Sequence, residues 1–297
     1  MNGKLIKIRG KKLYIEIHGE HNSNAVLYLH GGPGESCFDF SYHQAERLSK
    51  KMKLIAIDQR GVCRSEEIAD SEQFGLDDII DDCEALREYL NIGQWSLIGH
   101  SFGGFLAIKY ACLYPDSINK IILEGPTFDF KLTTLALLSK TAQLAEKYEM
   151  EDLKNQCLLL NDQNSTIQLL SAYMDLSYQL GENRMEIYTY NFNNPTDYAL
   201  YTQEEWDLFD GRAEVHYNRL REEGKIYDSL LPSLGQVKAP MLLLLGKYDP
   251  VTCPKQVKAF EEHVKFGDVF IFDKSGHTPH YEEEEFFGSI AIDYLNS

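Results

Sequence analysis

A serine flanked by glycines is the residue best placed to do chemistry. Residues 99–103, Gly-His-Ser-Phe-Gly, follow the pattern G-x-S-x-G around Ser101. The apolar run Trp95–Ile98 precedes them, and a run with helical character begins at Phe102. A serine on a sharp turn between a strand and a helix forms a nucleophile elbow, where small neighbours let the helix pack close behind the turn. We therefore predict that Ser101 is the nucleophile of an acyl-transfer reaction, with an ordinary strand-to-helix turn as the alternative.

A nucleophilic serine requires a general base, and the base requires an acid that orients it. Asp249 follows the apolar run Met241–Leu245, and His277 lies in the loop after the run Val269–Phe272. The order serine, acid, histidine is the one found in hydrolases with this kind of elbow. Open α/β sheets build their sites at the carboxyl ends of the strands, so both loops should lie near Ser101. We predict Asp249 as the acid and His277 as the base.

Other residues could fill these two roles. His280 lies three residues beyond His277 and is the main alternative base. Glu124 ends an earlier apolar run and is the alternative acid. Two further histidines are poorer candidates, because His100 lies inside the elbow and His263 lies in a helical pattern.

A second glycine-rich stretch, residues 30–34 (His-Gly-Gly-Pro-Gly), follows the apolar run Ala25–Leu29. Glycines allow a backbone to approach a bound substrate without a Cβ in the way. Acyl transfer generates an oxyanion that backbone N–H groups stabilise, and one of these groups belongs to the residue after the nucleophile. We predict that the N–H groups of Gly32 and Phe102 form the oxyanion hole, since Pro33 has no N–H to donate.

Several short apolar runs indicate strands that are buried on both faces. After an alternating segment, Leu13–Ile17, these runs are Ala25–Leu29, Leu54–Ile57, Trp95–Ile98, Ile121–Leu123, Met241–Leu245 and Val269–Phe272. Helical patterns, with apolar residues three and four positions apart, accompany them at Leu76–Leu90, Phe102–Tyr114, Lys255–Val264 and Glu282–Leu295. Strands that alternate with helices predict an α/β fold with a mostly parallel sheet.

One long segment departs from this alternation. It contains helical patterns at Leu135–Tyr148 and Ile167–Leu180, followed by an aromatic and polar stretch at residues 191–211, and it lacks a strong buried strand. We interpret it as a mostly helical cap inserted between two strands of the sheet. The predicted division is a core of residues 1–126 and 232–297 and a cap of residues 127–231.

The chain of 297 residues is strongly acidic, with 46 acidic and 29 basic residues and a formal net charge of −17. Such a chain repels phosphate backbones, so we expect no nucleic-acid partner. Four consecutive acids, Glu282–Glu285, are expected to open the last helix, where negative charge interacts favourably with the helix dipole.

Neither a membrane span nor a secretion signal is expected. The sequence has no apolar stretch of about 18 residues, and its basic N-terminal segment lacks the apolar region of a signal peptide. Six cysteines are scattered without C-x-x-C spacing, which argues against a zinc site and a disulfide scaffold. A cytoplasmic protein with free thiols is the simplest interpretation.

Three motifs together resemble the proline iminopeptidase family of α/β-hydrolases, which are serine peptidases that remove an N-terminal residue. The motifs are residues 30–34 (HGGPG), residues 58–61 (Asp-Gln-Arg-Gly) and the elbow at residues 99–103. The resemblance implies the α/β-hydrolase fold, a mostly parallel central sheet flanked by helices with an inserted helical cap. It also implies a small peptide or amino-acid amide as substrate, no cofactor, no metal, and a site made of Ser101, Asp249, His277, Gly32 and Phe102.

In this family, carboxylates of the cap bind the free amine of the substrate, and an ammonium group in a partly dry pocket needs such partners. The acids in the corresponding region are Glu204, Glu205, Asp207 and Asp210. Arg60 is expected to organise the structure rather than to take part in catalysis. Two positions depart from the family pattern: Cys63 replaces a glycine, and Phe102 replaces the tryptophan of many prolyl enzymes.

The leading hypothesis is an aminopeptidase or amino-acid amidase that acts on substrates with a free N-terminus. The same three catalytic residues could instead serve an esterase, a lactonase or a C–C bond hydrolase with an apolar cap. A ligand-binding protein built on a hydrolase fold is a third hypothesis, disfavoured because the whole catalytic set is present. The sequence leaves the preferred N-terminal residue and the oligomeric state open.

Overall fold

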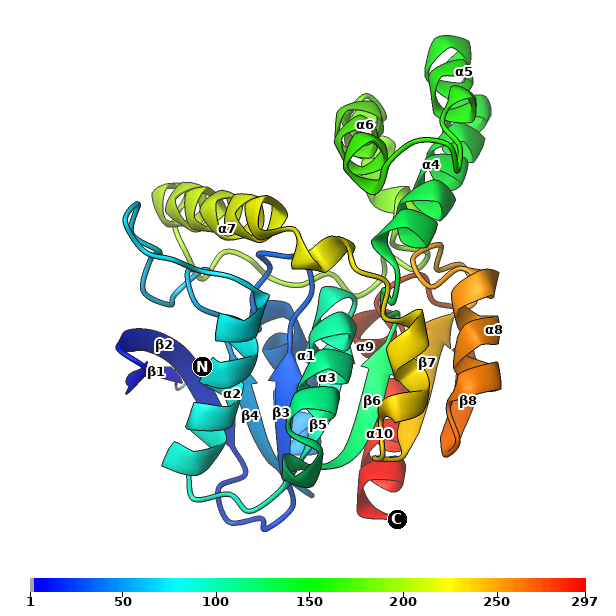
Figure 1. Cartoon of the computed structure of the whole chain (residues 1–297). Helices are drawn as coiled ribbons and strands as arrows, with labels where there is room; N and C mark the ends of the chain where they lie inside the picture. Colours follow the sequence, from blue (N-terminus) through cyan, green and yellow to red (C-terminus); the bar gives the residue numbers. More distant parts are fainter. Residues whose placement is uncertain (1–2) are drawn as a thin grey trace.

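Eight strands form one sheet in the computed structural model, which describes residues 3–297 (Figure 1). They are β1 (Gly3–Ile8), β2 (Lys11–His18), β3 (Ala25–Leu29), β4 (Lys53–Ile57), β5 (Trp95–His100), β6 (Ile118–Glu124), β7 (Met241–Gly246) and β8 (Gly267–Phe272). Their order across the sheet is β1-β2-β4-β3-β5-β6-β7-β8. The pairs β1–β2 and β2–β4 are antiparallel, and every pair from β4 to β8 is parallel. The mostly parallel sheet expected from the sequence is thereby confirmed.

Each strand-like run identified in the sequence falls within one of the strands β2–β8. Only β1 is missing from the sequence-based assignment. Three of its six residues are exposed, so neither a continuous apolar run nor a clear alternation marks it. It lies at the edge of the sheet and pairs on one side only, with β2.

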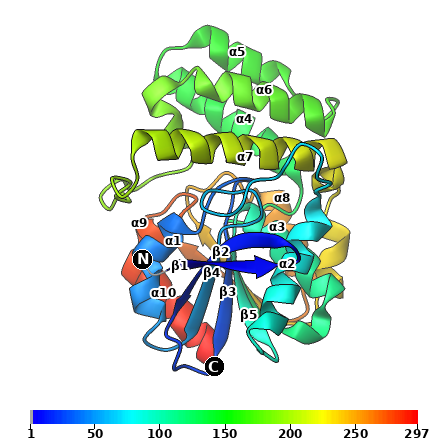
Figure 2. The same cartoon turned by 90° about the vertical axis from the view of Figure 1, so that its left-hand side faces the viewer.

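Helices cover both faces of the sheet, which is why its parallel strands read as continuous apolar runs. On one face lie α1 (Phe38–Leu48) and α10 (Glu284–Asn296); on the other lie α2 (Leu76–Tyr89), α3 (Phe102–Leu113) and α8 (Pro254–His263) (Figure 2). Successive residues of β5 belong to different layers of the core. Leu97 packs in the cluster that contains Phe105 of α3, and Ile98 packs in the cluster that contains Phe40 of α1.

The helix that follows the elbow, α3, is buried more completely than the other helices around the sheet. Nine of its twelve residues are buried, because it packs directly behind the central strands β3, β5 and β6. A short 3-10 helix, η1 (Pro115–Ser117), joins it to β6. Among the helices of residues 3–297, none is both long enough and apolar enough to cross a membrane.

Among the described residues between β6 and β7, every regular element is helical. In chain order they are α4 (Phe130–Lys147), α5 (Glu151–Leu159), α6 (Thr166–Tyr178), η2 (Gly181–Ile187), α7 (Gln203–Glu223), η3 (Lys225–Tyr227) and η4 (Leu231–Gln236). Figure 1 shows α4, α5 and α6 together above one side of the sheet and α7 above the other side. A separate apolar cluster that includes Leu138, Leu153 and Leu169 packs α4, α5 and α6 against one another. We propose residues 127–231 of this segment as the cap.

Helix α7 was not anticipated from the sequence, which suggested only an aromatic and polar stretch at its start. The helix begins with a capping box: the Thr202 hydroxyl accepts from the Glu205 N–H at 3.3 Å, and the Glu205 carboxylate accepts from the Thr202 N–H at 2.8 Å. This T-x-x-E pattern is readable in the sequence and marks a helix N-terminus. Of the whole helix only His216 and Leu220 are buried, so the apolar stripe that reveals most helices is short.

Only two of the four consecutive glutamates open the last helix as expected from sequence: Glu284 and Glu285 lie in the first turn of α10 (Glu284–Asn296), whereas Glu282 and Glu283 do not. Glu282 ends a short helix, α9 (Pro279–Glu282), and α10 begins at Glu284, with Glu283 between them at φ −130° and ψ 54°. The carboxylates also hold other segments. Glu283 accepts from the Lys274 N–H at 2.9 Å, and Glu284 pairs with Arg47 of α1 at 3.0 Å.

Candidate active site

Ser101 lies at the turn between β5 and α3 in a strained backbone conformation. Its φ of 53° and ψ of −117° fall outside the regions that most residues adopt. Its N–H donates to Glu124 O at 2.9 Å, and its carbonyl accepts from the Gly104 N–H at 3.0 Å. A Cβ on Gly103 would lie 1.9 Å from Leu29 O, so glycine is required for α3 to pack this close to β3. These features together form an elbow that exposes the serine side chain at the carboxyl end of the sheet.

Asp249 and His277 form a pair just beyond the ends of β7 and β8. Asp249 Oδ1 lies 3.1 Å from His277 Nδ1 and also accepts from the Val251 N–H at 2.8 Å. Burial acts to lower the pKa of His277, but the charge of Asp249, the hydrogen bond to it and the charges of Glu35 and Glu124 together raise that pKa. A Cβ on Gly125 would lie 2.7 Å from His277 Nδ1, so the pair is tightly packed. The contact at Nδ1 fixes the ring and leaves Nε2 available.

Ser101 and His277 line one cavity with a volume of about 590 Å³. Residues of the core and of the cap both contribute to its wall. Within residues 3–297, no hydrogen bond joins the Ser101 hydroxyl to the His277 ring. Such contacts commonly tighten only when substrate is bound. The cavity therefore brings the expected nucleophile and base together, with the expected acid behind the base.

His280 and Glu124, the alternative base and acid, bind each other. His280 Nδ1 lies 3.0 Å from Glu124 Oε1, and His280 Nε2 lies 2.8 Å from Asp39 Oδ2. Burial acts to lower the pKa of His280, but the charge of Glu124 and the hydrogen bonds to both carboxylates raise that pKa to about 10. An imidazolium with both nitrogens bonded to carboxylates cannot take a proton from a serine. We therefore keep His277 as the proposed base and Asp249 as the proposed acid.

Within residues 3–297, one group of side chains has the composition and spacing of metal ligands. It consists of His100, Glu124 and His280, which are buried and whose ligand atoms lie within 4.8 Å of one another. The His100 Nε2 atom is bonded to the His277 carbonyl at 3.2 Å, and both nitrogens of His280 face carboxylates. Metal binding requires a neutral imidazole with a free lone pair. The group therefore fits an internal ion pair better than a metal site.

The loop of residues 30–34 lies against the nucleophile. A Cβ on Gly31 would lie 3.1 Å from Ser101 Cβ, so this residue must stay small. Gly32 has a φ of 107°, which favours glycine, and it lines the cavity. Within residues 3–297, neither the Gly32 N–H nor the Phe102 N–H donates a hydrogen bond. Because an oxyanion needs such free donors, we keep these two groups as the proposed oxyanion hole.

Arg60 of the Asp-Gln-Arg-Gly motif does not line the cavity. Its guanidinium group forms a bidentate pair with Asp82, at 2.7 and 2.8 Å, and donates to Glu72 at 3.0 Å. Its carbonyl oxygen lies 2.8 Å from His216 Nδ1 of α7. The residue thus holds the loop after β4 together and connects that loop to the cap, which agrees with the structural role expected for it.

Of the cap acids expected to bind an amine, Asp210 lines the cavity and Glu204 and Glu205 do not. Both glutamates are exposed in the first turn of α7, and Glu205 is engaged in the capping box of that helix. Asp207 is exposed as well. Acids in the first turn of a helix are stabilised by its N–H groups and its dipole, which explains the acidic composition of this stretch without a substrate.

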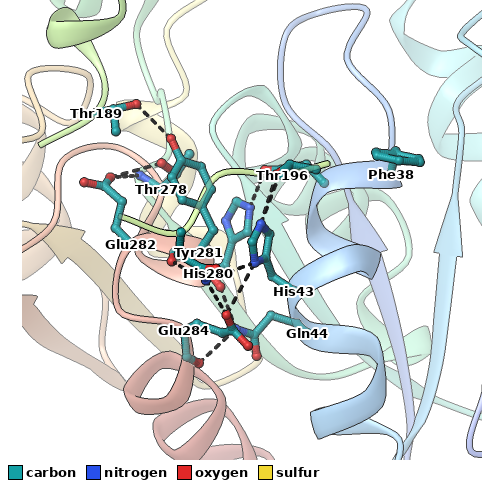
Figure 3. Close-up of polar contacts among 12 residues, drawn as sticks. Phe38, His43, Gln44, Thr189, Thr196, Thr278, His280, Tyr281, Glu282 and Glu284 are labelled. Atoms are coloured by element: carbon teal, nitrogen blue, oxygen red, sulfur yellow. Dashed lines mark hydrogen bonds and ion pairs between the residues drawn. The ribbon is translucent and has the colours of Figure 1, made fainter. Parts of the chain in front are cut away.

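Glu282 organises the loop that carries His277, a role that the sequence did not reveal. Its buried carboxylate accepts from the N–H groups of Gly276 and Tyr190, at 2.9 and 2.8 Å. It also accepts from the Thr278 hydroxyl at 3.0 Å (Figure 3). Tyr190 belongs to the segment that follows η2, so one carboxylate fixes both the histidine loop and the neighbouring part of the cap. A run of four glutamates usually indicates an exposed surface, which is why sequence alone conceals this residue.

Two carboxylates of the core, Glu35 and Asp39, also line the cavity. They follow the loop of residues 30–34 closely, and Asp39 lies in the first turn of α1. Sequence reasoning did not single out either residue, because a helix-starting acid after a glycine-rich turn is common on protein surfaces. Folding of the chain brings both carboxylates into the same cavity as Ser101.

Replacing Asp249 by asparagine is expected to lower kcat by about 10⁴-fold and to change KM little. Asparagine keeps the shape of the side chain but loses the charge that stabilises the imidazolium, and its NH2 group can donate to His277 Nδ1 and so hold the ring in the wrong tautomer. The measurement is steady-state kinetics with the best available substrate. The matched control is Glu124→Gln, which disturbs the pair with His280 and is expected to reduce stability more than kcat. If Asp249→Asn lowered kcat only slightly while a folded Glu124→Gln variant lost most of its kcat, the acid would be Glu124.

Comparison with known proteins agrees with this architecture. A family model described as the alpha/beta hydrolase fold matches residues 24–284. The chain is also similar to the proline iminopeptidase of Heyndrickxia coagulans, with 24% identity over 98% of each chain. The match over nearly the full length of both chains means that core and cap are compared together.

Solved structures give the same fold. The proline iminopeptidase of Mycobacterium smegmatis superposes with a TM-score of 0.74 and 19% identity, covering 99% of this chain and 98% of that one. An esterase from Exiguobacterium antarcticum superposes with a TM-score of 0.67 and 20% identity, covering 100% of both chains. A peptidase and an esterase resemble this chain about equally at the level of the backbone, so the fold alone does not select between their reactions.

Proposed function

The chain belongs to the α/β-hydrolase fold family, and we propose that it is a serine hydrolase that removes the N-terminal residue from short peptides or cleaves amino-acid amides. The observation that carries the proposal is the cavity that Ser101 and His277 share with the carboxylates of Glu35 and Asp39. A positively charged amine is the substrate group that such a cavity would attract. The resemblance to a proline iminopeptidase over the whole chain supports the same substrate class.

In the proposed reaction, His277 Nε2 takes the proton of the Ser101 hydroxyl while Oγ attacks the carbonyl carbon of the scissile amide. The Gly32 and Phe102 N–H groups stabilise the resulting oxyanion. His277 gives the proton to the leaving amine, the C–N bond breaks, and an acyl-enzyme ester remains on Ser101. A water deprotonated by His277 then hydrolyses the ester and restores the serine. Asp249 orients the ring and stabilises its protonated form throughout.

An ester, lactone or C–C bond hydrolase is the second candidate, and the apolar part of the cavity favours it. The apolar side chains that line the cavity include Phe130, Leu137, Leu170, Met174, Met185, Phe209 and Val251. An uncharged acyl chain would bury its surface against these side chains, which is favourable at about 25 cal/mol per Å². The same triad and oxyanion hole would serve this reaction.

The two candidates differ in what they require of the substrate's amine. For the proposed aminopeptidase, kcat/KM for an aminoacyl arylamide is expected to exceed that for its N-acetyl form by roughly a hundredfold or more. The α-amino group titrates near pH 8 and is mostly cationic at neutral pH. Acetylation removes this charge and leaves a cavity carboxylate without its partner.

The measurement is an initial-rate comparison of the arylamide, its N-acetyl form and a short-chain p-nitrophenyl ester on one enzyme preparation. The ester serves as a control that the catalytic residues are active. Equal rates for the two arylamides, or fast ester turnover beside negligible arylamide turnover, would favour the second candidate.

A further inference from the structure

The carboxylate of Glu35 lies beside the nucleophile. Glu35 directly follows the loop of residues 30–34 and lines the cavity together with Ser101. A Cβ on Gly31 would lie 2.7 Å from Glu35 Oε2 and 3.1 Å from Ser101 Cβ. The carboxylate oxygen and Ser101 Cβ therefore lie no more than about 6 Å apart, which is the two distances laid end to end.

Within the part of the chain that the structure describes, the Glu35 carboxylate has no hydrogen-bond partner. The charged groups that act on it from a distance are His277, Asp39 and His280. Water in the cavity can reach the side chain, yet burial among the surrounding protein raises the pKa of Glu35 above its ordinary value. A cation placed against this carboxylate would replace the hydration that it has lost.

Asp39, the other core carboxylate of the cavity, is already paired. Its Oδ2 atom lies 2.8 Å from His280 Nε2, and its Oδ1 atom accepts from the Thr196 hydroxyl. Burial acts to raise the pKa of Asp39, but the hydrogen bond to His280, the charge of His280 and the hydrogen bond to Thr196 together lower that pKa. Thr196 also contacts His43 Nε2 at 2.9 Å, and Figure 3 shows this network between α1, α9 and the cap. Asp39 is thus committed to the structure, and Glu35 remains available to a ligand.

The distances in an aminoacyl substrate match this arrangement. Its amine nitrogen lies about 2.5 Å from the carbonyl carbon by bond geometry, and that carbon lies about 3 Å from the serine oxygen before attack. A charge-assisted contact between ammonium and carboxylate spans about 2.8 Å. A carboxylate oxygen within about 6 Å of Ser101 Cβ is therefore within reach of the amine while the carbonyl carbon faces the serine.

We propose that Glu35, rather than an acid of the cap, binds the α-ammonium group of the substrate and so restricts the enzyme to acyl groups with a free amine. This inference rests on the proposed function. Among the cap acids considered above, only Asp210 lines the cavity. Asp210 and Glu35 are both exposed, and the observation that favours Glu35 is its position beside Ser101. The glutamate next to the oxyanion loop would then set both the position of the carbonyl and the charge requirement of the substrate.

The test compares Glu35→Gln with wild type on two substrates, an aminoacyl arylamide and the p-nitrophenyl ester of the same acyl skeleton without its amine. Glutamine keeps the size of the side chain and removes its charge. We expect kcat/KM for the arylamide to fall by roughly a hundredfold, whereas kcat/KM for the ester changes less than about threefold. Glu214→Gln, an exposed acid of α7 outside the cavity, is the matched control and should change neither value.

The other outcomes each overturn the inference. An equal loss on both substrates would mean that Glu35 acts through the charge state of His277. If Glu35→Gln left kcat/KM for the arylamide unchanged and Asp210→Asn lowered it, the substrate amine would bind at the cap. A wild-type enzyme that hydrolyses the ester and not the arylamide would overturn the proposed function itself, which distinguishes that failure from the failure of Glu35 alone. The melting temperature of Glu35→Gln should be close to that of wild type, because Glu35 is exposed and its carboxylate makes no hydrogen bond within residues 3–297.

Discussion

Replacing Ser101 by alanine is expected to lower kcat by about 10⁶-fold, the loss typical of a triad serine. The hydroxyl lies in the cavity at the elbow between β5 and α3, and the proposed acyl-enzyme cannot form without it. The residual rate should come from substrate binding and the oxyanion hole alone. The measurement is kcat for the better of the arylamide and ester substrates, with the protein at high concentration so that a small residual rate is visible.

Stability should be nearly unchanged in this variant. Alanine meets the same backbone requirement as serine at a φ of 53°, so we expect the free energy of unfolding to change by no more than about 0.5 kcal/mol. Ser289→Ala, an exposed serine on α10, is the matched control for the loss of a hydroxyl. A Ser101→Ala protein that is folded and keeps more than a few per cent of wild-type turnover would contradict the assignment of the nucleophile.

Replacing His277 by alanine is expected to cost about as much as the loss of the serine, because a base and its nucleophile act as one unit. His280→Ala should retain at least about a hundredfold more activity, since a general base accounts for 10²- to 10⁴-fold or more of the rate. The reason is structural: His277 shares the cavity with Ser101 and bonds to Asp249, whereas both nitrogens of His280 bond to Glu124 and Asp39.

The two histidines should also differ in what they do for stability. Removing His280 leaves the buried Glu124 carboxylate without its charge partner, which is expected to cost about 3–5 kcal/mol. Thermal or denaturant unfolding measured beside kcat separates these effects. Equal losses of kcat in two folded variants would leave the base unassigned, and a larger loss in His280→Ala would reverse the assignment.

Much of the architecture follows from local sequence. The seven strands β2–β8, the helices α2, α3, α4, α6, α8 and α10, and the elbow at Ser101 all coincide with patterns of a few consecutive residues. Buried parallel strands have to be apolar on both faces, and glycines have to flank a serine on a strained turn. Because these constraints act within a short stretch of chain, they produce residue patterns that can be recognised in a single sequence.

The sequence-based assignment missed the elements that lack such a pattern. β1 is half exposed, and α7 buries only two of its residues, so neither shows a full apolar pattern. Glu282 and Glu283 were misplaced for a related reason, whereas Glu284 and Glu285 start α10 as expected. The run of four glutamates suits a helix start, but Glu282 is engaged by the N–H groups of the histidine loop and of the cap, and these partners come from distant parts of the chain.

The sequence by itself determined that this protein has an α/β sheet with a serine on an elbow, followed by candidate acids and bases in the expected order. Only the tertiary structure decided how those groups pair. It joined His277 to Asp249 across 28 positions and His280 to Glu124 across 156, and it brought Glu35 to Ser101 while leaving Glu204 and Glu205 outside the cavity. The physical reason is range. Backbone preferences and the spacing of apolar residues are properties of neighbours in sequence. An ion pair or a hydrogen bond depends instead on a separation of about 3 Å in space, which the packing of the whole chain sets.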